Sequence, residues 1–167
     1  MHDYNFHDLL KPLDEEHQEQ LLWFWNLKGK IINWKDIEPV QFRKVPKGIY
    51  RPEGKEYVHV KNIIGSEYNP RESLSLLEDV DGGWYFEYPP ENNPNGMNFF
   101  TNKSFRECGE SLIPIGFIYQ TQNKITHPEN PISLYKVCGP ALCRYNESLD
   151  IFHLYGFNFD GTARILT

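Results

Sequence analysis

The sequence predicts a mostly-β protein, a barrel or curled sheet with two or three helices. Three observations favour this class. Aromatic residues make up 15% of the 167 residues, and Tyr, Phe and Trp are enriched in strands. Gly and Pro occur 12 times each, which is typical of chains with many tight turns. Several apolar segments after residue 56 alternate with a period of two, as half-buried strands do.

The first expected element is a helix that begins near Pro12 and ends at Gly29. Acidic residues occupy positions 14–16, where they stabilise the positive end of the helix dipole, and glycine is a common helix stop. The apolar run 21–25 is too aromatic for a helix that stands alone in water. We expect it to pack on the main domain, with a dimer contact through this helix as the alternative.

The remaining elements follow from alternation and from turn residues. A short helix is expected over residues 101–110, capped by Thr101 or Asn102 and ended by Gly109. We divide the chain into an N-terminal helical arm and linker, residues 1–44, and a domain, residues 45–167. Strands are expected over residues 57–64, 84–88, 112–120, 132–139, 141–146 and 149–157.

Several classes of protein are disfavoured by what the sequence lacks. No apolar run approaches the roughly 20 residues of a membrane span, and the acidic N-terminus is unlike a signal peptide. Three cysteines cannot all pair, which indicates a reducing cytoplasm. Nucleophile elbows, phosphate loops and paired zinc ligands are missing from the sequence. We therefore expect no catalytic residue, metal or cofactor.

One enzymatic alternative stays open. Asp36, Glu53 and Lys55 could form an acid, acid, lysine triad that binds a divalent metal and activates water, as in a nuclease. Such a triad needs carboxylates that project from adjacent strands. Glu53 follows Arg51 and Pro52, which are typical of a turn rather than a strand.

Charge is distributed unevenly along the chain. The formal net charge is −6, which disfavours a nucleic-acid partner at first sight. Residues 28–61, however, hold nine Lys or Arg against four acids, and the segments on both sides of them are acidic. A basic segment of this kind allows an anionic partner without requiring one.

The segment with the most specific chemistry is residues 74–90. A turn with Glu78, Asp79 and Asp81 leads through two glycines into a strand that holds Trp84 and Tyr88. Asp-Gly is a common hairpin signal, so an ordinary acidic turn is one interpretation. Carboxylates beside stacking aromatics are also the means by which a protein holds an extruded nucleobase.

Three segments resemble the SRA domain, a PUA-like β-barrel module that reads modified cytosine by flipping it from duplex DNA. Residues 48–52, Gly-Ile-Tyr-Arg-Pro, resemble its opening motif, residues 78–88 its acidic turn and aromatic strand, and residues 100–120 the helix and strand that follow. The resemblance is closer to the divergent SRA-like domain found N-terminal to HNH nucleases in McrA-like restriction enzymes. It covers roughly residues 45–158.

The resemblance implies roles for individual residues. Asp79 would accept a hydrogen bond from the exocyclic amine of cytosine, and Tyr88 would stack on the base. Leu76 stands where the family has a second stacking tyrosine, so the stacking is one-sided or is completed by Tyr68, Phe99 or Trp84. Residues expected at the DNA backbone are Arg43, Lys44, Lys47, Tyr50, Arg51, Lys61, Asn102 and Lys103.

The resulting expectation is a curled PUA-like or SRA-like β-barrel of the α+β class, with an N-terminal helical arm. It would bind duplex DNA that contains methyl- or hydroxymethyl-type cytosine and act as the targeting module of a restriction system. No HNH motif occurs in the sequence, so a nuclease domain would act in cis or in trans. The alternatives are the nuclease triad above and a PUA-like module for RNA or a modified nucleotide.

Overall fold

The computed structural model describes residues 2–33, 35–37, 48–64 and 76–165. These residues form a mostly-β structure of the α+β class, with three α-helices and short 3-10 segments. The helices are α1 (Phe6–Leu10), α2 (Glu15–Asn26), η3 (Gly96–Asn98) and α3 (Phe100–Glu110). The strands are β1 (His2–Asn5), β2 (Ile31–Asn33), β3 (Gly48–Tyr50), β4 (His59–Asn62), β5 (Leu77–Glu78), β6 (Trp84–Tyr88), β7 (Ile115–Gln122), β8 (Leu134–Asn146), β9 (Ile151–Gly156) and β10 (Thr162–Ile165).

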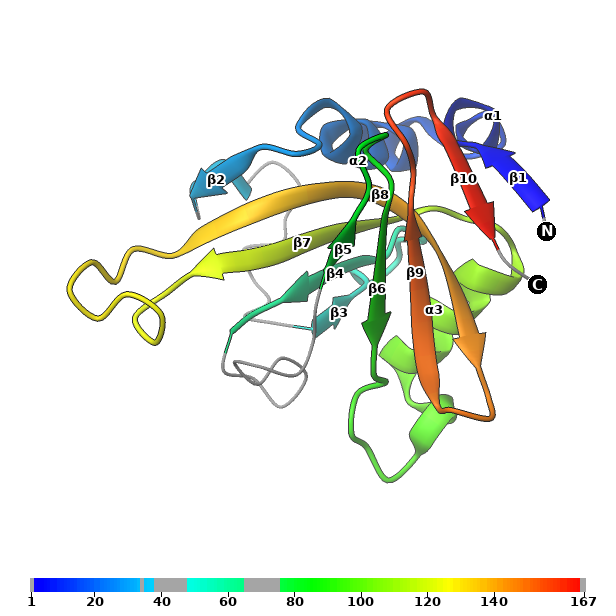
Figure 1. Ribbon diagram of the computed structural model, residues 1–167. Helices are drawn as coiled ribbons and strands as arrows, with labels where there is room; N and C mark the ends of the chain where they lie inside the picture. Colours follow the sequence, from blue (N-terminus) through cyan, green and yellow to red (C-terminus); the bar gives the residue numbers. More distant parts are fainter. Residues whose placement is uncertain (1, 34, 38–47, 65–75, 166–167) are drawn as a thin grey trace.

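The main sheet is curled but open. Its strands follow the order β3-β4-β7-β8-β9-β6-β5, and β2 pairs with β8 outside this path. Within the described residues the two end strands, β3 and β5, do not pair with each other, so the curled sheet does not close into a barrel. Figure 1 shows the two halves of the sheet curving away from the long strand β8, with α3 beside the lower end of β8 and β9.

Strand β8 changes its partner along one edge. Its first residues pair with β2, and its second half, from Ala141, pairs with β9. Gly139 lies between these two stretches with φ +107, a left-handed conformation that glycine adopts without strain. The backbone of residues 28–30 reaches this part of β8: Gly29 N donates to the Val137 carbonyl at 2.7 Å. This change of partner leaves room beside β8 for the site described below.

The core lies on the inner face of the sheet, as the alternation in residues 84–88 predicts. Trp84, Phe86 and Tyr88 are buried, whereas Glu87 between them is exposed. Helix α3 closes this core with Phe105, whose ring lies 4.4 Å from that of Phe152. The helix expected over 101–110 is confirmed, but its expected cap is wrong. The N-cap is Phe99, because the Asn102 side chain instead bonds the backbone of Glu91 and Gly96.

The N-terminal segment is packed onto the sheet. Strand β1 pairs with β10, and α2 lies along β7 and β8. Asp14 caps α2 by accepting from His17 N at 2.8 Å, and Leu21 and Phe24 have no exposed surface. The helix thus follows the core-packing interpretation of its apolar run. The boundary expected at residue 44 lies outside the described residues and stays a prediction.

Candidate functional site

A small cavity lies beneath the turn that joins β5 to β6. It has a volume of about 100 Å³. Three of the four residues expected at a base-binding pocket line it, namely Leu76, Asp79 and Trp84. Its other walls come from distant parts of the chain: Lys28 after α2, Lys136 and Cys138 of β8, and Phe159 between β9 and β10.

The β5–β6 turn holds the Asp79 carboxylate at the cavity. Asp79 N donates to the Gly83 carbonyl at 2.8 Å, and Gly82 N donates to the Asp79 carbonyl at 3.1 Å. Asp81 N donates to Asp79 Oδ1 at 3.3 Å. Asp79 is exposed, and its Oδ2 has no hydrogen-bond partner among the residues that the structure describes. One carboxylate oxygen therefore shapes the turn and the other can accept from a ligand.

Gly82 explains why this turn needs glycine. Its φ is +89, and an added Cβ would lie 2.5 Å from the Phe159 ring. The Asp-Gly signal in the sequence therefore marks both a hairpin turn and the close approach of the β9–β10 loop.

Trp84 forms a wall of the cavity and is itself fixed in the core. Its side chain is 7% exposed, and its indole Nε1 donates to the Cys138 carbonyl at 2.8 Å. The ring stacks on Phe117 with centroids 5.1 Å apart. Buried indole N–H groups usually find such a partner, so Trp84 ties β6 to β8 at the floor of the cavity.

Tyr88 lies at the opposite end of β6. It is 1% exposed and its ring packs near those of Phe86 and Phe105. It lies four positions from Trp84 along the strand, a distance of roughly 13 Å. The structure thus does not bring Tyr88 to the cavity that Asp79 lines, and its stacking role stays a prediction.

Two lysines that the sequence did not assign to the pocket line the cavity. Lys136 Nζ bonds both carboxylate oxygens of Glu78, at 2.6 and 2.7 Å. Lys28 Nζ donates to the carbonyl oxygens of Gly82 and Cys138, and it lies 5.4 Å from the centre of the Phe159 ring. Burial lowers the pKa of Lys28 to about 8. No local pattern around residue 28 distinguishes it from the other lysines of the basic segment.

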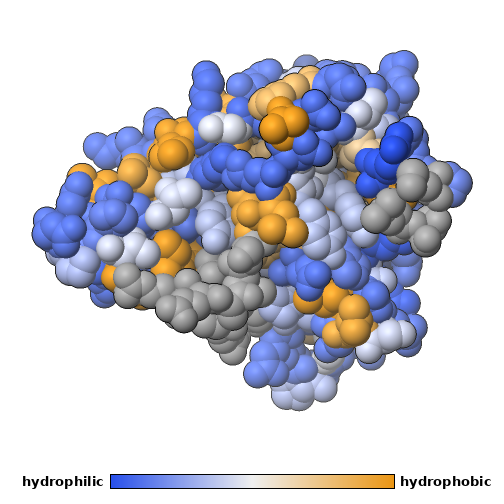
Figure 2. Space-filling model, viewed as in Figure 1, coloured by the Kyte–Doolittle hydropathy of each residue, from blue (hydrophilic) through white to orange (hydrophobic). Residues whose placement is uncertain are grey.

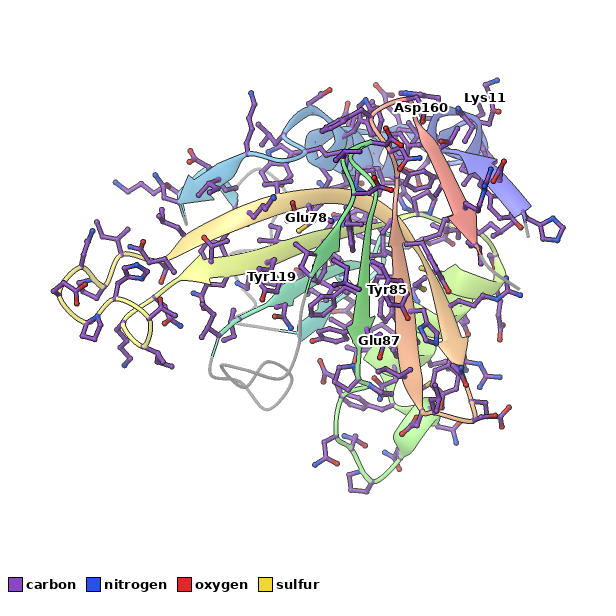
Figure 3. All side chains as sticks on the ribbon, viewed as in Figure 1. Lys11, Glu78, Tyr85, Glu87, Tyr119 and Asp160 are labelled. Carbon is purple, nitrogen blue, oxygen red and sulfur yellow. The ribbon has the colours of Figure 1, made fainter. Side chains whose placement is uncertain are left out.

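An open groove of about 980 Å³ adjoins the cavity and shares Glu78, Asp79, Gly83 and Trp84 with it. Tyr85 and Glu87 project from β6 on this side (Figure 3), and Tyr85 contacts His153 of β9 through its hydroxyl. Figure 2 shows this face as mostly hydrophilic, with apolar side chains gathered in separate patches.

Ion pairs neutralise two acids of the groove. Lys136 pairs with Glu78, and Arg164 pairs with Asp3 at 2.7 Å. The arginine holds the pKa of the Asp3 carboxyl below its usual value. Asp79 and Asp81 have no cationic partner within the described parts of the chain. The negative charge that remains is therefore concentrated at the mouth of the cavity.

The residues expected at the DNA backbone have different surroundings. Lys103 is exposed on α3, and Tyr50 and Arg51 are partly exposed at β3. Arg51 donates to Ser104 Oγ at 3.1 Å. Arg43, Lys44 and Lys47 lie outside the described residues.

Two members of that set have no surface to offer a phosphate. Lys61 of β4 is 0% exposed, and burial lowers its pKa to about 7. Asn102 is also 0% exposed, and its amide holds the backbone before α3. Both side chains were expected at the surface because a strand or helix position alone does not reveal what covers it.

The three residues of the nuclease alternative have different surroundings. Lys55 pairs with Glu16 at 2.6 Å, Asp36 Oδ2 accepts from Asn33 N at 3.4 Å, and Glu53 lies in an exposed turn. In the part of the chain that the structure describes, no group of three His, Cys, Asp or Glu could hold a metal ion.

All three cysteines are buried, and burial raises the pKa of Cys108 to about 12, which disfavours the reactive thiolate. No helix in the described ranges combines the length and the hydropathy needed to cross a membrane.

Comparison with known proteins gives few matches. No family model and no curated protein matches the chain. Two solved structures are similar to it: KRYPTONITE in complex with mCHG DNA and SAH, and KRYPTONITE in complex with mCHH DNA, H3(1-15) peptide and SAH. Both have 12% sequence identity and a TM-score of 0.44, and they cover 95% and 96% of this chain. The chain spans 40% of the length of these two structures.

Proposed function

We propose that this chain is a binding module for duplex DNA with a modified cytosine, which it reads as an extruded base in the cavity beneath the β5–β6 turn. One observation carries the proposal. Leu76, Asp79 and Trp84, chosen from the sequence as pocket residues, line one cavity together. That cavity opens toward a groove with which it shares Asp79 and Trp84.

The dimensions favour a single planar base. A cavity of about 100 Å³ is smaller than the roughly 300–1,000 Å³ of most small-molecule pockets. The groove of about 980 Å³ leaves room for the sugar and phosphates of an extruded nucleotide. Extrusion costs a few kcal/mol, which hydrogen bonds to the base and stacking must offset.

Asp79 supplies the acceptor that cytosine needs. The exocyclic amine of cytosine is a donor, and thymine has a carbonyl oxygen at the same position. A hydrogen bond to a charged acceptor contributes about 1.5–3 kcal/mol. Asp79 Oδ2 has no partner among the described residues, so the amine would replace only solvent there.

Contacts to the DNA backbone would come from residues outside the cavity and the groove. Lys103, Arg51 and Tyr50 have exposed or partly exposed side chains, and we assign phosphate contacts to them and to Arg43, Lys44 and Lys47. Such contacts position a protein on DNA without reading its sequence. The module would then direct a nuclease domain, in cis or in trans, as part of a modification-dependent restriction system.

The test is a gel-shift series with one duplex that carries plain, methylated, hydroxymethylated or glucosylated cytosine at a single position. We expect the wild-type chain to bind one modified duplex more tightly than the plain one. Asp79→Asn should weaken that binding more than tenfold, because the amide presents a donor as well as an acceptor. Asp8→Asn, an equal charge change on the exposed part of α1, is the control and should bind as the wild type does.

A fluorescent base analogue next to the modified cytosine tests extrusion directly. Its emission should rise on binding because its neighbour leaves the stack. Equal affinity for all four duplexes, or a folded Asp79→Asn with unchanged affinity, would contradict the proposal. Tighter binding of single-stranded RNA or of free modified nucleosides would favour the alternative PUA-like module.

A further inference from the structure

Lys28 connects three segments that form the cavity. It follows α2 directly, and its ammonium donates to the Gly82 carbonyl in the β5–β6 turn and to the Cys138 carbonyl of β8, the latter at 3.2 Å. The Phe159 ring of the β9–β10 loop lies 5.4 Å away. The stem of the side chain packs on Gly139, where an added Cβ would lie 3.1 Å from Lys28 Cγ. The position of this ammonium is therefore fixed from several directions.

Among the residues that the structure describes, the charge of Lys28 has no carboxylate partner. Lys136, Lys55 and Lys11 each form an ion pair with an acid. Lys28 forms none among the described residues, since the nearby Glu78 is bonded to Lys136. Half-buried cations are usually paired, and here carbonyl dipoles and one aromatic face take that role. A hydrogen-bond acceptor on a ligand in the cavity would give the Lys28 ammonium a further partner.

The ammonium also has a donor left. A lysine carries three N–H donors, and two carbonyl oxygens accept from Lys28. The same cavity holds the free oxygen of Asp79. A donor and an acceptor from segments about fifty residues apart thus lie on the wall of one small space.

We propose that Lys28 donates its remaining N–H to ring N3 or O2 of the extruded cytosine while Asp79 accepts from its exocyclic amine. This assignment rests on the function proposed above and names the residue that sets its base specificity. Cytosine presents a donor followed by two acceptors along its pairing edge, whereas thymine presents an acceptor, a donor and an acceptor. When the exocyclic group of the base faces Asp79 and N3 faces Lys28, the carboxylate and the lysine match the first pattern and oppose the second.

A pH dependence follows from the surroundings of the ammonium. Burial lowers the pKa of Lys28 to about 8, Glu78 and Cys138 favour the charged form, and Lys136 opposes it. Asp79 also lines the cavity with its negative charge. Above pH 8 a growing fraction of Lys28 loses its proton and with it the charge that strengthens the hydrogen bond to the base. Binding of the modified duplex should therefore weaken as pH rises from 7.5 to 9.

The experiment compares Lys28→Met, Lys28→Gln and the control Lys30→Met. Lys30 is exposed two residues further along and is not part of the cavity wall. Dissociation constants are measured for the preferred modified duplex and for a duplex with thymine mispaired at the same position. We expect Lys28→Met to bind the cytosine duplex at least tenfold more weakly and to lose most of its preference over thymine. Lys28→Gln, which keeps a neutral donor, should regain part of the preference and show no decline between pH 7.5 and 9.

The outcomes separate this assignment from the function itself. If the wild type prefers modified cytosine and a folded Lys28→Gln has the same affinity, preference and pH profile, the assignment is wrong and the function stands. If the wild type prefers no modified duplex, the proposed function fails and the assignment fails with it. Thermal melting identifies variants that do not fold, and Lys28→Gln provides the readout if Lys28→Met is one of them. Equal losses in Lys28→Met and Lys30→Met for both duplexes would indicate a phosphate contact and overturn the assignment.

Discussion

The cavity beneath the β5–β6 turn and the polar cluster at α2 differ in whether their ionisable side chains face open space. We define the α2 cluster as His17, Gln20, Tyr57 and His59. His59 has no exposed surface, and its Nε2 lies 3.1 Å from Gln20 Oε1. The ring stacks on Tyr57 with centroids 5.4 Å apart. The cluster encloses its polar atoms between a helix and a sheet.

The cavity leaves its polar groups facing open space. Lys28, Asp79 and Lys136 all line it, and Asp79 is exposed to solvent. Burial lowers a pKa in both places, to about 8 for Lys28 and to about 3 for His59. A shifted pKa therefore does not separate the two regions, because structural groups are shifted as strongly as binding groups. The adjoining space separates them, since only a group on a cavity can meet a ligand.

The largest expected difference between the two regions is in how much a substitution lowers the free energy of unfolding. Phe24 of α2 is fully buried with its ring 4.6 Å from that of His59. Phe24→Ala should lower the free energy of unfolding by about 3–5 kcal/mol, because it leaves a hole that the sheet cannot fill. Val80 in the β5–β6 turn is 94% exposed, so Val80→Ala should change the free energy of unfolding by less than about 0.5 kcal/mol. Urea denaturation measures both, and comparable losses would mean that α2 is no more tightly packed than the turn.

The second largest expected effect is a loss of stability at low pH, caused by the α2 cluster. The pKa of His59 is lowered from 6.5 to about 3, chiefly by burial and secondly by His17. Between these values the unfolded chain binds a proton at this position and the folded chain does not, so stability falls as pH falls. The loss from His59 approaches about 1.4 kcal/mol per pH unit in that window. His59→Gln should show a shallower decline from pH 6.5 to 4, and parallel curves for the two proteins would contradict a buried neutral histidine.

The smallest expected effect lies at the cavity rim. The Glu78 side chain is 48% exposed and pairs with Lys136, and exposed pairs contribute about 0–1 kcal/mol. Glu78→Gln should therefore shift the urea midpoint only slightly, and 1 M salt should shift the wild type in the same direction. A loss above 2 kcal/mol would show that the rim supports the fold as the α2 cluster does.

Local pattern was sufficient to predict several parts of this structure. Alternation placed Trp84, Phe86 and Tyr88 on one buried face, and Gly82 marked the hairpin turn that carries Asp79. The helix near residues 101–110 was expected from its cap and stop residues, and it is present although its N-cap is Phe99. These features depend on interactions between residues a few positions apart, which the order of side chains along the chain determines.

Tertiary structure alone decided which of these parts meet. The pairing of β1 with β10 joins the two ends of the described chain, and no local pattern indicates it. Lys28 and Asp79 line one cavity, because Lys28 reaches the β5–β6 turn at the Gly82 carbonyl, near the point where β8 changes its partner. Tyr88 is separated from Asp79 by the length of β6, although both belong to one continuous motif in the sequence. The sequence by itself determined the faces of its strands and the chemistry of its turns, and strand order decided which of them share a cavity.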